Sequence, residues 1–215
     1  MANLRELYEE VLTDYNESVS APRVVSVQEV RDAINEGLDD LSMYTSFYET
    51  SRVVDLPAGR VYHNVAGALG EDVMYITRAQ NRLNSFWMDA ESQLSMDGRV
   101  YSQWESNVGE PCTFIPIDIT WFAVHPTRED DGARIRMFCI AIHPHLTSDE
   151  AVPDLPPDMH IALRKFALAE LCLLDHEMDL YDAFFTEYAF LREKLAERVR
   201  GRFARDRVAG VRYAG

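Results

Sequence analysis

Apolar residues near the N-terminus recur at the spacing of one helix face. Leu4, Leu7, Val11 and Tyr15 lie three or four positions apart, and polar residues occupy the positions between them. Such a period is typical of an amphipathic helix with one buried side. The pattern predicts a helix over residues 2–16, which ends before Pro22.

A second helix is expected to begin at Ser26. The Ser26 hydroxyl and the Glu29 carboxylate, three residues apart, form the pattern of a capping box, in which each side chain binds a free backbone N–H. The apolar residues that follow line one face as far as about Tyr44: Val27, Val30, Ile34, Leu38 and Leu41. Acidic residues lie mostly on the other face, which we expect to be solvated.

From residue 45 to about residue 144 the helical period gives way to short β-type segments. TSFYETSRVVDLPAG, RVYHNV, EDVMYITRAQN and RVYSQWES are each predicted to hold a strand, and residues 83–94 could form a short helix. The strongest β segments are TFIPIDITWFAVHP and ARIRMFCIAIHP, which are rich in branched and aromatic residues. The turn REDDG between them predicts a hairpin-like arrangement.

The C-terminal part of the chain returns to the helical period. Pro156 and Pro157 are tolerated at the start of a helix, and residues 160–174 are predicted to form a very apolar one. A second helix follows the DHE triplet, with an apolar stripe at Leu180, Phe184, Tyr188, Leu191, Leu195 and Val199. After Gly201 the pattern fades, which predicts a tail that becomes ordered against a partner.

These elements indicate an α+β fold. We expect a helical bundle built from the N- and C-terminal helices, an inserted and mostly antiparallel β domain, and an extended C-terminal tail. The expected boundaries are residues 1–45 and 153–200 for the helical domain, 46–152 for the inserted domain and 201–215 for the tail.

Composition narrows the classes of function. The chain has 215 residues and a net charge of −15, which argues against general nucleic-acid binding. Residues 198–215 reverse this balance, with six arginines and one acidic residue. No apolar stretch is long enough for a membrane span, and the first residues do not form a signal peptide, so a cytosolic origin and no membrane partner are expected. Three widely spaced cysteines favour buried free thiols.

The residues that could carry chemistry do not form a catalytic or metal-binding pattern. His143 and His145 could in principle bind a metal, but Pro144 between them favours a turn at a strand end. Asp175, His176 and Glu177 are consecutive, and consecutive helical side chains point about 100° apart, so a connection between two helices is the better interpretation. We therefore expect no catalytic residues, no metal, no cofactor and no enzymatic activity.

Several motifs follow one another in a fixed order along the chain. In the first half, after a short first helix, they comprise Asn35, Gly37 and Leu41 of the second helix, then Asp55, Leu56, Pro57 and Ala58. In the second half, they comprise Gly109, Pro111, Phe114, Pro126, Asp154, Leu155, Pro156, Ala162, Leu163, Ala167, Leu168 and Ala169. In this order, the motifs resemble one known family, the head-to-tail adaptor (head-completion connector) proteins of tailed bacteriophages.

The resemblance implies a structural virion protein. Adaptors of this kind form a ring of copies, usually twelve, under the portal at one capsid vertex. The ring extends the DNA channel and presents a platform for tail or nozzle proteins. The implied partners are other copies of the chain, the portal protein, tail or nozzle proteins, and genomic DNA that passes through the lumen without sequence-specific binding. Assembly would occur in the host cytoplasm, with the finished protein at the virion neck.

The arginine-rich C-terminus is the candidate site for portal binding under this interpretation. The hypothesis assigns the contact to six residues: Arg198, Arg200, Arg202, Arg205, Arg207 and Tyr213. Three alternatives stay open from the sequence. They are a tail-tube or tail-completion subunit, a small cytosolic enzyme built around His143, His145 or His176, and a binding module that holds nucleic acid through its basic tail.

Overall fold

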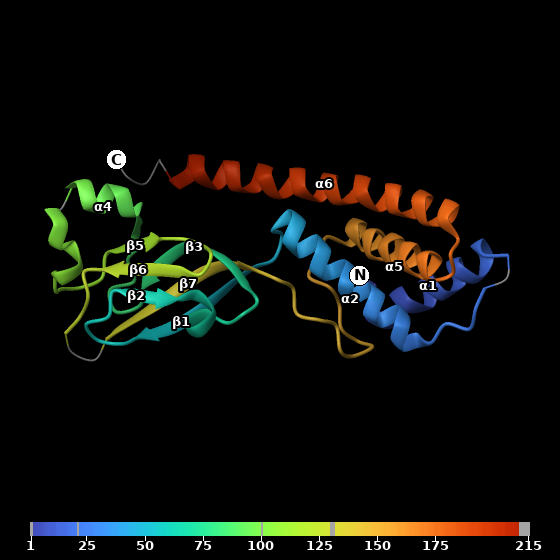
Figure 1. Ribbon diagram of the computed structural model, residues 1–215, viewed down its shortest axis with the longest axis horizontal. Coiled ribbons are helices and arrows are strands. Elements are labelled where there is room, and N and C mark those ends of the chain that lie inside the picture. The colour runs from blue at the N-terminus through green and yellow to red at the C-terminus, as the bar shows by residue number, and fades with distance from the viewer. Residues whose placement is uncertain (1, 21, 100, 130–131, 211–215) are drawn as a thin grey trace. The chain divides into compact units, whose positions relative to one another are not determined.

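The computed structural model describes residues 2–20, 22–99, 101–129 and 132–210, with side chains omitted at 99, 101–102 and 203–210. The chain divides into two compact units (Figure 1). Met1–Tyr48 and Ile142–Gly215 form the helical unit, and Glu49–Ala141 form the inserted unit. Residues 142–152, which the sequence assigned to the inserted domain, lie in the helical unit, where Leu4 N–H donates to the Ala151 carbonyl. The α+β class is confirmed.

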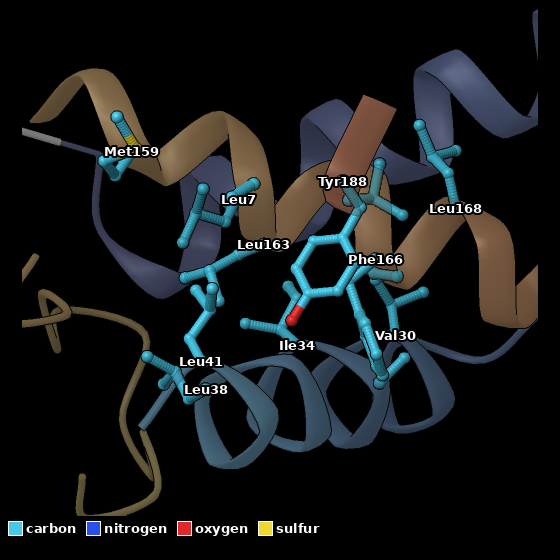
Figure 2. Close-up of a cluster of buried hydrophobic side chains, with 14 of the residues drawn as sticks. Leu7, Val30, Ile34, Leu38, Leu41, Met159, Leu163, Phe166, Leu168 and Tyr188 are labelled. Carbon is cyan, nitrogen blue, oxygen red and sulfur yellow. The ribbon is translucent and has the colours of Figure 1, made fainter. Parts of the chain in front are cut away.

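Four helices form the part of the helical unit that the structure describes. They are α1 (Leu4–Ser18), α2 (Val27–Thr45), α5 (His160–Leu174) and α6 (Met178–Gly210), with a short 3-10 turn η2 (Pro157–Met159) before α5. Figure 2 shows side chains from all four converging in one core, among them Leu7 of α1, Ile34 of α2, Leu163 of α5 and Tyr188 of α6. The predicted apolar stripes are therefore the faces that pack together.

The first two helices begin where their side chains can bind the free backbone amides. Ser26 and Glu29 form the predicted capping box at the start of α2. Asn3 and Glu6 form a second capping box at the start of α1, which the sequence analysis missed. Each box satisfies two N–H groups that would otherwise have no partner in the first turn of the helix.

Gly37 allows α2 and α5 to approach closely. A Cβ atom at Gly37 would lie 3.0 Å from Cδ1 of Phe166, which is tighter than ordinary van der Waals contact. The Phe166 ring in turn packs edge-on against Tyr188 of α6, with ring centroids 5.1 Å apart. The absent side chain on α2 thus makes room for an aromatic pair that joins two other helices.

The predicted connection between α5 and α6 is confirmed as a tight turn. His176 takes a left-handed backbone conformation with φ of 62°, its N–H donates to the Leu173 carbonyl, and the Glu177 N–H donates to the Cys172 carbonyl. These two bonds are those of a Schellman motif, which closes the end of a helix. The Asp-His-Glu triplet is therefore a helix terminus, in which the three side chains do not converge.

Helix α6 is longer than predicted, and the prediction of an extended tail from residue 201 was wrong as far as Gly210. The helix spans 33 residues and continues through Gly201. An internal glycine costs a helix only about 1 kcal/mol relative to alanine, and good helix formers surround it. Residues 211–215, the rest of the predicted tail, lie outside the described residues.

The inserted unit holds two sheets. Sheet A has the order β1-β7-β3 and is antiparallel, with β1 at Glu49–Leu56, β7 at Ala133–Ala141 and β3 at Val73–Asn81. Sheet B has the order β2-β6-β5-β4. Its strands are β2 (Tyr62–Asn64), β6 (Trp121–His125), β5 (Thr113–Pro116) and the short β4 (Asp89–Ala90), which pairs parallel to β5. A mostly antiparallel inserted domain is confirmed.

Two expectations about individual strands were wrong. The REDDG segment does not close a hairpin, because β6 pairs with β2 and β5 in sheet B whereas β7 pairs with β1 and β3 in sheet A. The hairpin lies instead within TFIPIDITWFAVHP, where the Asp118 carboxylate accepts the N–H groups of Thr120 and Trp121 in the β5–β6 turn. RVYSQWES does not form a strand, since it holds the end of α4 and the 3-10 helix η1.

Helical segments cover one side of sheet B. α4 (Gln93–Arg99) and η1 (Tyr101–Ser106) follow each other, and a short α3 (Val65–Leu69) lies after β2. Met96 and Trp104 are buried against Ile115 and Ala123 of sheet B. One side of this sheet is therefore shielded from solvent by Met96 of α4 and by Trp104 of η1, and Trp104 belongs to the segment that we expected to form a strand.

Candidate functional site

The arginines of the predicted portal contact lie on α6. Arg198, Arg200 and Arg202 are exposed, and they lie around and beyond Val199, the last described core residue of the helix. Arg205 and Arg207 also lie within α6, but their side chains are outside what the structure describes. Tyr213 lies outside the described residues altogether. The structure therefore carries these arginines on a helix, where the sequence predicted an extended segment.

Arg198 forms an ion pair with a residue outside α6. Its guanidinium lies 2.6 Å from the Asp158 carboxylate, and this contact joins α6 to the turn before α5. The Arg200 guanidinium lies 3.8 Å from the carboxylate of Glu193, which is two turns earlier on the same helix. The side chains of all four residues are at least 50% exposed, and ion pairs between such exposed side chains contribute little stability. The structure thus gives Arg198 an intramolecular partner that the sequence did not indicate.

A buried polar contact holds α6 against α2. The Tyr188 hydroxyl donates to the Asp40 carboxylate, which also accepts from Arg192 at 2.9 Å. The Arg192 guanidinium lies over the Tyr44 ring, 4.0 Å from its centroid. Burial and the bond to Asp40 raise the pKa of Tyr188, so the hydroxyl keeps its proton and stays a donor. This contact fixes the direction of the helix that carries the arginines.

A second polar cluster holds the α5–α6 turn. The Asp175 carboxylate accepts a hydrogen bond from the Tyr15 hydroxyl, and its other oxygen lies 2.9 Å from Arg23 Nε. Burial and the bond to Asp175 raise the pKa of Tyr15 to about 12. Arg23 also contacts Glu29 at 2.7 Å. Asp175 therefore ties α1 and the segment before α2 to the turn.

His143 and His145 do not share a ligand position. His143 Nε2 accepts from the Asp154 N–H at 3.0 Å and Nδ1 lies 2.6 Å from the Pro144 carbonyl, so both ring nitrogens are engaged. His145 Nε2 lies 2.9 Å from the Asp39 carboxylate. Within the described ranges, no group of three or more His, Cys, Asp or Glu side chains could hold a metal ion.

Two of the three cysteines are buried as free thiols, as predicted, and the third is not. Cys139 and Cys172 are buried free thiols, as predicted, but Cys112 is exposed. Burial raises the pKa of the Cys139 thiol to about 12 and that of Cys172 to about 11. Thiols with such pKa values stay protonated at neutral pH, and a protonated thiol is a poor nucleophile.

The sequence comparison decides the family. The model of one family, described as "SU10 adaptor protein", matches residues 2–212. The chain belongs to the SU10 adaptor protein family. This is a family of phage head-to-tail adaptors, so the resemblance that the motifs indicated is confirmed. Among curated proteins, no match to the chain was found.

Family membership makes the chain a structural component of the phage head–tail junction, which places it at the virion neck. In this adaptor, the polar contacts of Asp40 and Asp175 hold helices of the helical unit together. None of the helices in the described part of this adaptor is both long and apolar enough to cross a bilayer.

Proposed function

We propose that copies of this adaptor form a closed ring, with twelve subunits, beneath the portal. The ring extends the DNA channel of the portal and offers a platform to tail or nozzle proteins. The observation that carries this proposal is the extent of the family match, which runs from residue 2 to residue 212 and includes both units and α6. A closed cyclic ring requires heterologous contacts, in which each copy uses two different surfaces.

The C-terminal end of α6 is the proposed portal contact. Beyond Val199, the last core residue of α6 with a described side chain, the helix continues to Gly210, a length of about 16 Å. Residues 198–215 carry a net charge of +5, whereas residues 1–197 carry a net charge of −20. We assign the docking on an acidic portal surface to Arg198, Arg200, Arg202, Arg205, Arg207 and Tyr213.

The acidic remainder of the chain suits the wall of a DNA channel. Because DNA is a polyanion, an acidic lumen repels it and keeps it from adhering during packaging and ejection. The DNA would then pass through the ring without sequence-specific contacts. Neutralising lumen carboxylates should slow ejection, and an unchanged ejection rate in such a phage would contradict this part of the proposal.

Charge reversal at the end of α6 tests the portal contact. We expect R200E/R202E/R205E/R207E to weaken binding to purified portal rings by at least ~100-fold, because like charges would face each other at the interface. R60E is the matched control, since Arg60 is an exposed arginine of the inserted unit whose side chain binds only the Tyr62 carbonyl among the described residues. Equal portal affinity for the two variants would refute the assignment of the contact to α6.

A further inference from the structure

Among the described residues of the inserted unit, one face of sheet A is more exposed than the other. Along β7, Ile135, Met137 and Cys139 are buried, whereas the alternate residues Arg134, Arg136 and Phe138 point to the other side. The register sets Ser51, Val53 and Asp55 of β1 beside them on one flank, and Arg78 and Gln80 of β3 on the other. We call this the outer face of sheet A.

The outer face of sheet A concentrates positive charge. Arg82 belongs to it as well, because its N–H donates to the Arg134 carbonyl and it follows the buried Asn81. The inserted unit has eight arginines, no lysine and thirteen acidic residues. Four of those arginines lie on this face: Arg78, Arg82, Arg134 and Arg136. Charge is thus segregated within a unit that is acidic as a whole.

Two of the four arginines are already paired within the sheet. Arg78 lies 3.1 Å from the Glu49 carboxylate, and Arg134 lies 3.4 Å from that of Asp55. Arg82 and Arg136 form no ion pair or side-chain hydrogen bond with any residue that the structure describes. The face therefore presents two arginines whose donors are open to a partner.

Apolar and aromatic groups lie between these arginines. The Trp87 ring packs on Phe138 with centroids 5.2 Å apart, and Arg78 lies over both rings. Trp87 is 52% exposed and Val53, opposite Arg136, is 39% exposed. Tryptophan and arginine are the residues most enriched at the energetic centres of protein interfaces. The composition of the face is that of a protein contact.

Nucleic acid fits this face less well than an acidic protein surface. Only two arginines are free to neutralise phosphates, and a protein that binds DNA without sequence preference needs several such contacts. Glu49 and Asp55 would also face the DNA backbone. A protein surface with a few carboxylates and some apolar contact matches both the open donors and the exposed rings.

The helical unit of the same chain offers such carboxylates. Asp32 and Glu36 are exposed one turn apart on α2, and Glu170 lies half-buried on α5, which packs against α2. Neither Glu36 nor Glu170 forms an ion pair with any cation in the described part of the chain. Burial raises the pKa of Glu170, and the nearby charge of Glu36 raises it further.

We propose that the outer face of sheet A docks on the α2–α5 carboxylates of a second copy of this chain. Arg82 and Arg136 bind Asp32, Glu36 and Glu170, while Trp87 and Val53 supply the apolar part of the contact. The two surfaces are different and complementary, so the contact is heterologous and can propagate from copy to copy. This inference rests on the proposed ring and names one pair of surfaces within it.

Two charge-reversed variants test this contact. R82E/R136E makes the sheet face acidic, and D32R/E36R makes the helical face basic. Asp32, Glu36 and Arg82 are exposed and Arg136 is half-buried, so both variants should fold, which circular dichroism of each will verify. Native mass spectrometry then counts the copies in assemblies of the full chain, both alone and bound to purified portal rings.

Each variant alone should associate at least ~100-fold more weakly than wild type, because its two surfaces carry charge of the same sign. An equimolar mixture should restore assemblies in which the two variants alternate, since every contact then joins opposite charges. R60E, with its arginine outside the outer face of sheet A, should assemble like wild type.

Three results would overturn the inference. In the first, R82E/R136E assembles as wild type does, or loses only binding to a DNA oligonucleotide. In the second, both variants are defective but their mixture is not restored. In the third, restoration occurs only when all four changes are in one chain, which would indicate a contact within a single copy. If wild type forms no assembly of several copies in any condition, the proposed ring itself fails.

Discussion

The hydroxyl of Tyr188 donates a hydrogen bond to the carboxylate of Asp40, and this bond joins α6 to α2 across 148 positions of sequence. Tyr188 is fully buried, and its ring packs against Phe166 and Phe185. Because α6 carries the arginines of the proposed portal contact, the Tyr188–Asp40 bond sets the direction in which those arginines are presented.

Replacing Tyr188 by phenylalanine should test the importance of this bond. Y188F removes the donor but keeps the ring, and leaves Asp40 with Arg192 as a partner. We expect the free energy of unfolding to fall by about 1–3 kcal/mol, measured by chemical denaturation. The control is Y44F, which removes an exposed hydroxyl that donates to Glu193 and should change stability by less than about 0.5 kcal/mol. Equal losses in the two variants would contradict this account.

Two glycines in helices should respond to alanine in opposite ways. At Gly37 the new methyl group would lie 3.0 Å from Phe166, so G37A should destabilise the helical unit by about 1–3 kcal/mol. At Gly201, no described atom outside the helix's own nearby backbone lies within 4 Å of the new Cβ, so G201A should stabilise α6 by up to about 1 kcal/mol. Thermal denaturation of both variants checks the signs. A loss of helix content in G201A would contradict the continuous α6.

Gly201 shows which features of the fold can be predicted from the sequence and which cannot. The Ser26–Glu29 capping box and the turn after Leu174 were predicted correctly, because both depend on residues that are close in sequence. The C-terminal end of α6 was predicted too early, because the free-energy cost of a single glycine in a helix is smaller than the stabilisation that the surrounding helical residues supply. The partners of Asp40 and Asp175 could not be foreseen, since Tyr188 and Tyr15 lie about 150 positions away from them.

The pairing of the strands was the second feature that could not be predicted from the sequence. β6 and β7 each have the composition of a buried strand, and the short polar segment between them favoured a hairpin. Their actual partners are remote: β7 pairs with β1 and β3, and β6 with β2 and β5. Composition shows that a strand is buried but does not select its partner, because register depends on tertiary packing. For the same reason the outer face of sheet A became visible only once the register was known.

His143 and His145 should differ in their effect on stability, although they lie two residues apart. The His143 ring is buried, stacks near Phe47 and Tyr48, and its Nε2 accepts from Asp154 N–H. H143A should lower the free energy of unfolding by about 2–4 kcal/mol and speed hydrogen exchange at the Asp154 amide. H145A removes only an exposed pair with Asp39 and should cost less than about 1 kcal/mol. Similar losses for both variants would argue against distinct roles.

His63 should make the inserted unit sensitive to acid. Burial lowers the pKa of His63 from 6.5 to about 4, and its Nε2 has no partner among the described residues. Since the folded pKa lies below the unfolded one, the stabilisation is complete above pH ~6.5 and is lost progressively as the pH falls from 6.5 to about 4. The total is of the order of 3 kcal/mol.

The variant H63F isolates this contribution. Phenylalanine fills a similar volume beside Phe122 and cannot be protonated, so the variant should lose less stability than wild type between pH 7 and pH 4. The measurement is chemical denaturation at several pH values. Parallel pH profiles for wild type and H63F would exclude His63 as a source of acid sensitivity.

Electron microscopy of purified portal rings mixed with this adaptor tests the central claim most directly. If the chain is a head-to-tail adaptor that binds through α6, the portal should gain one further ring of density, with α6 at the contact and a channel in line with that of the portal. A chain that ends at Val199 should leave the portal bare. Portal particles without added density in the presence of the full chain would contradict the account, as would an equally occupied ring formed by the shortened chain.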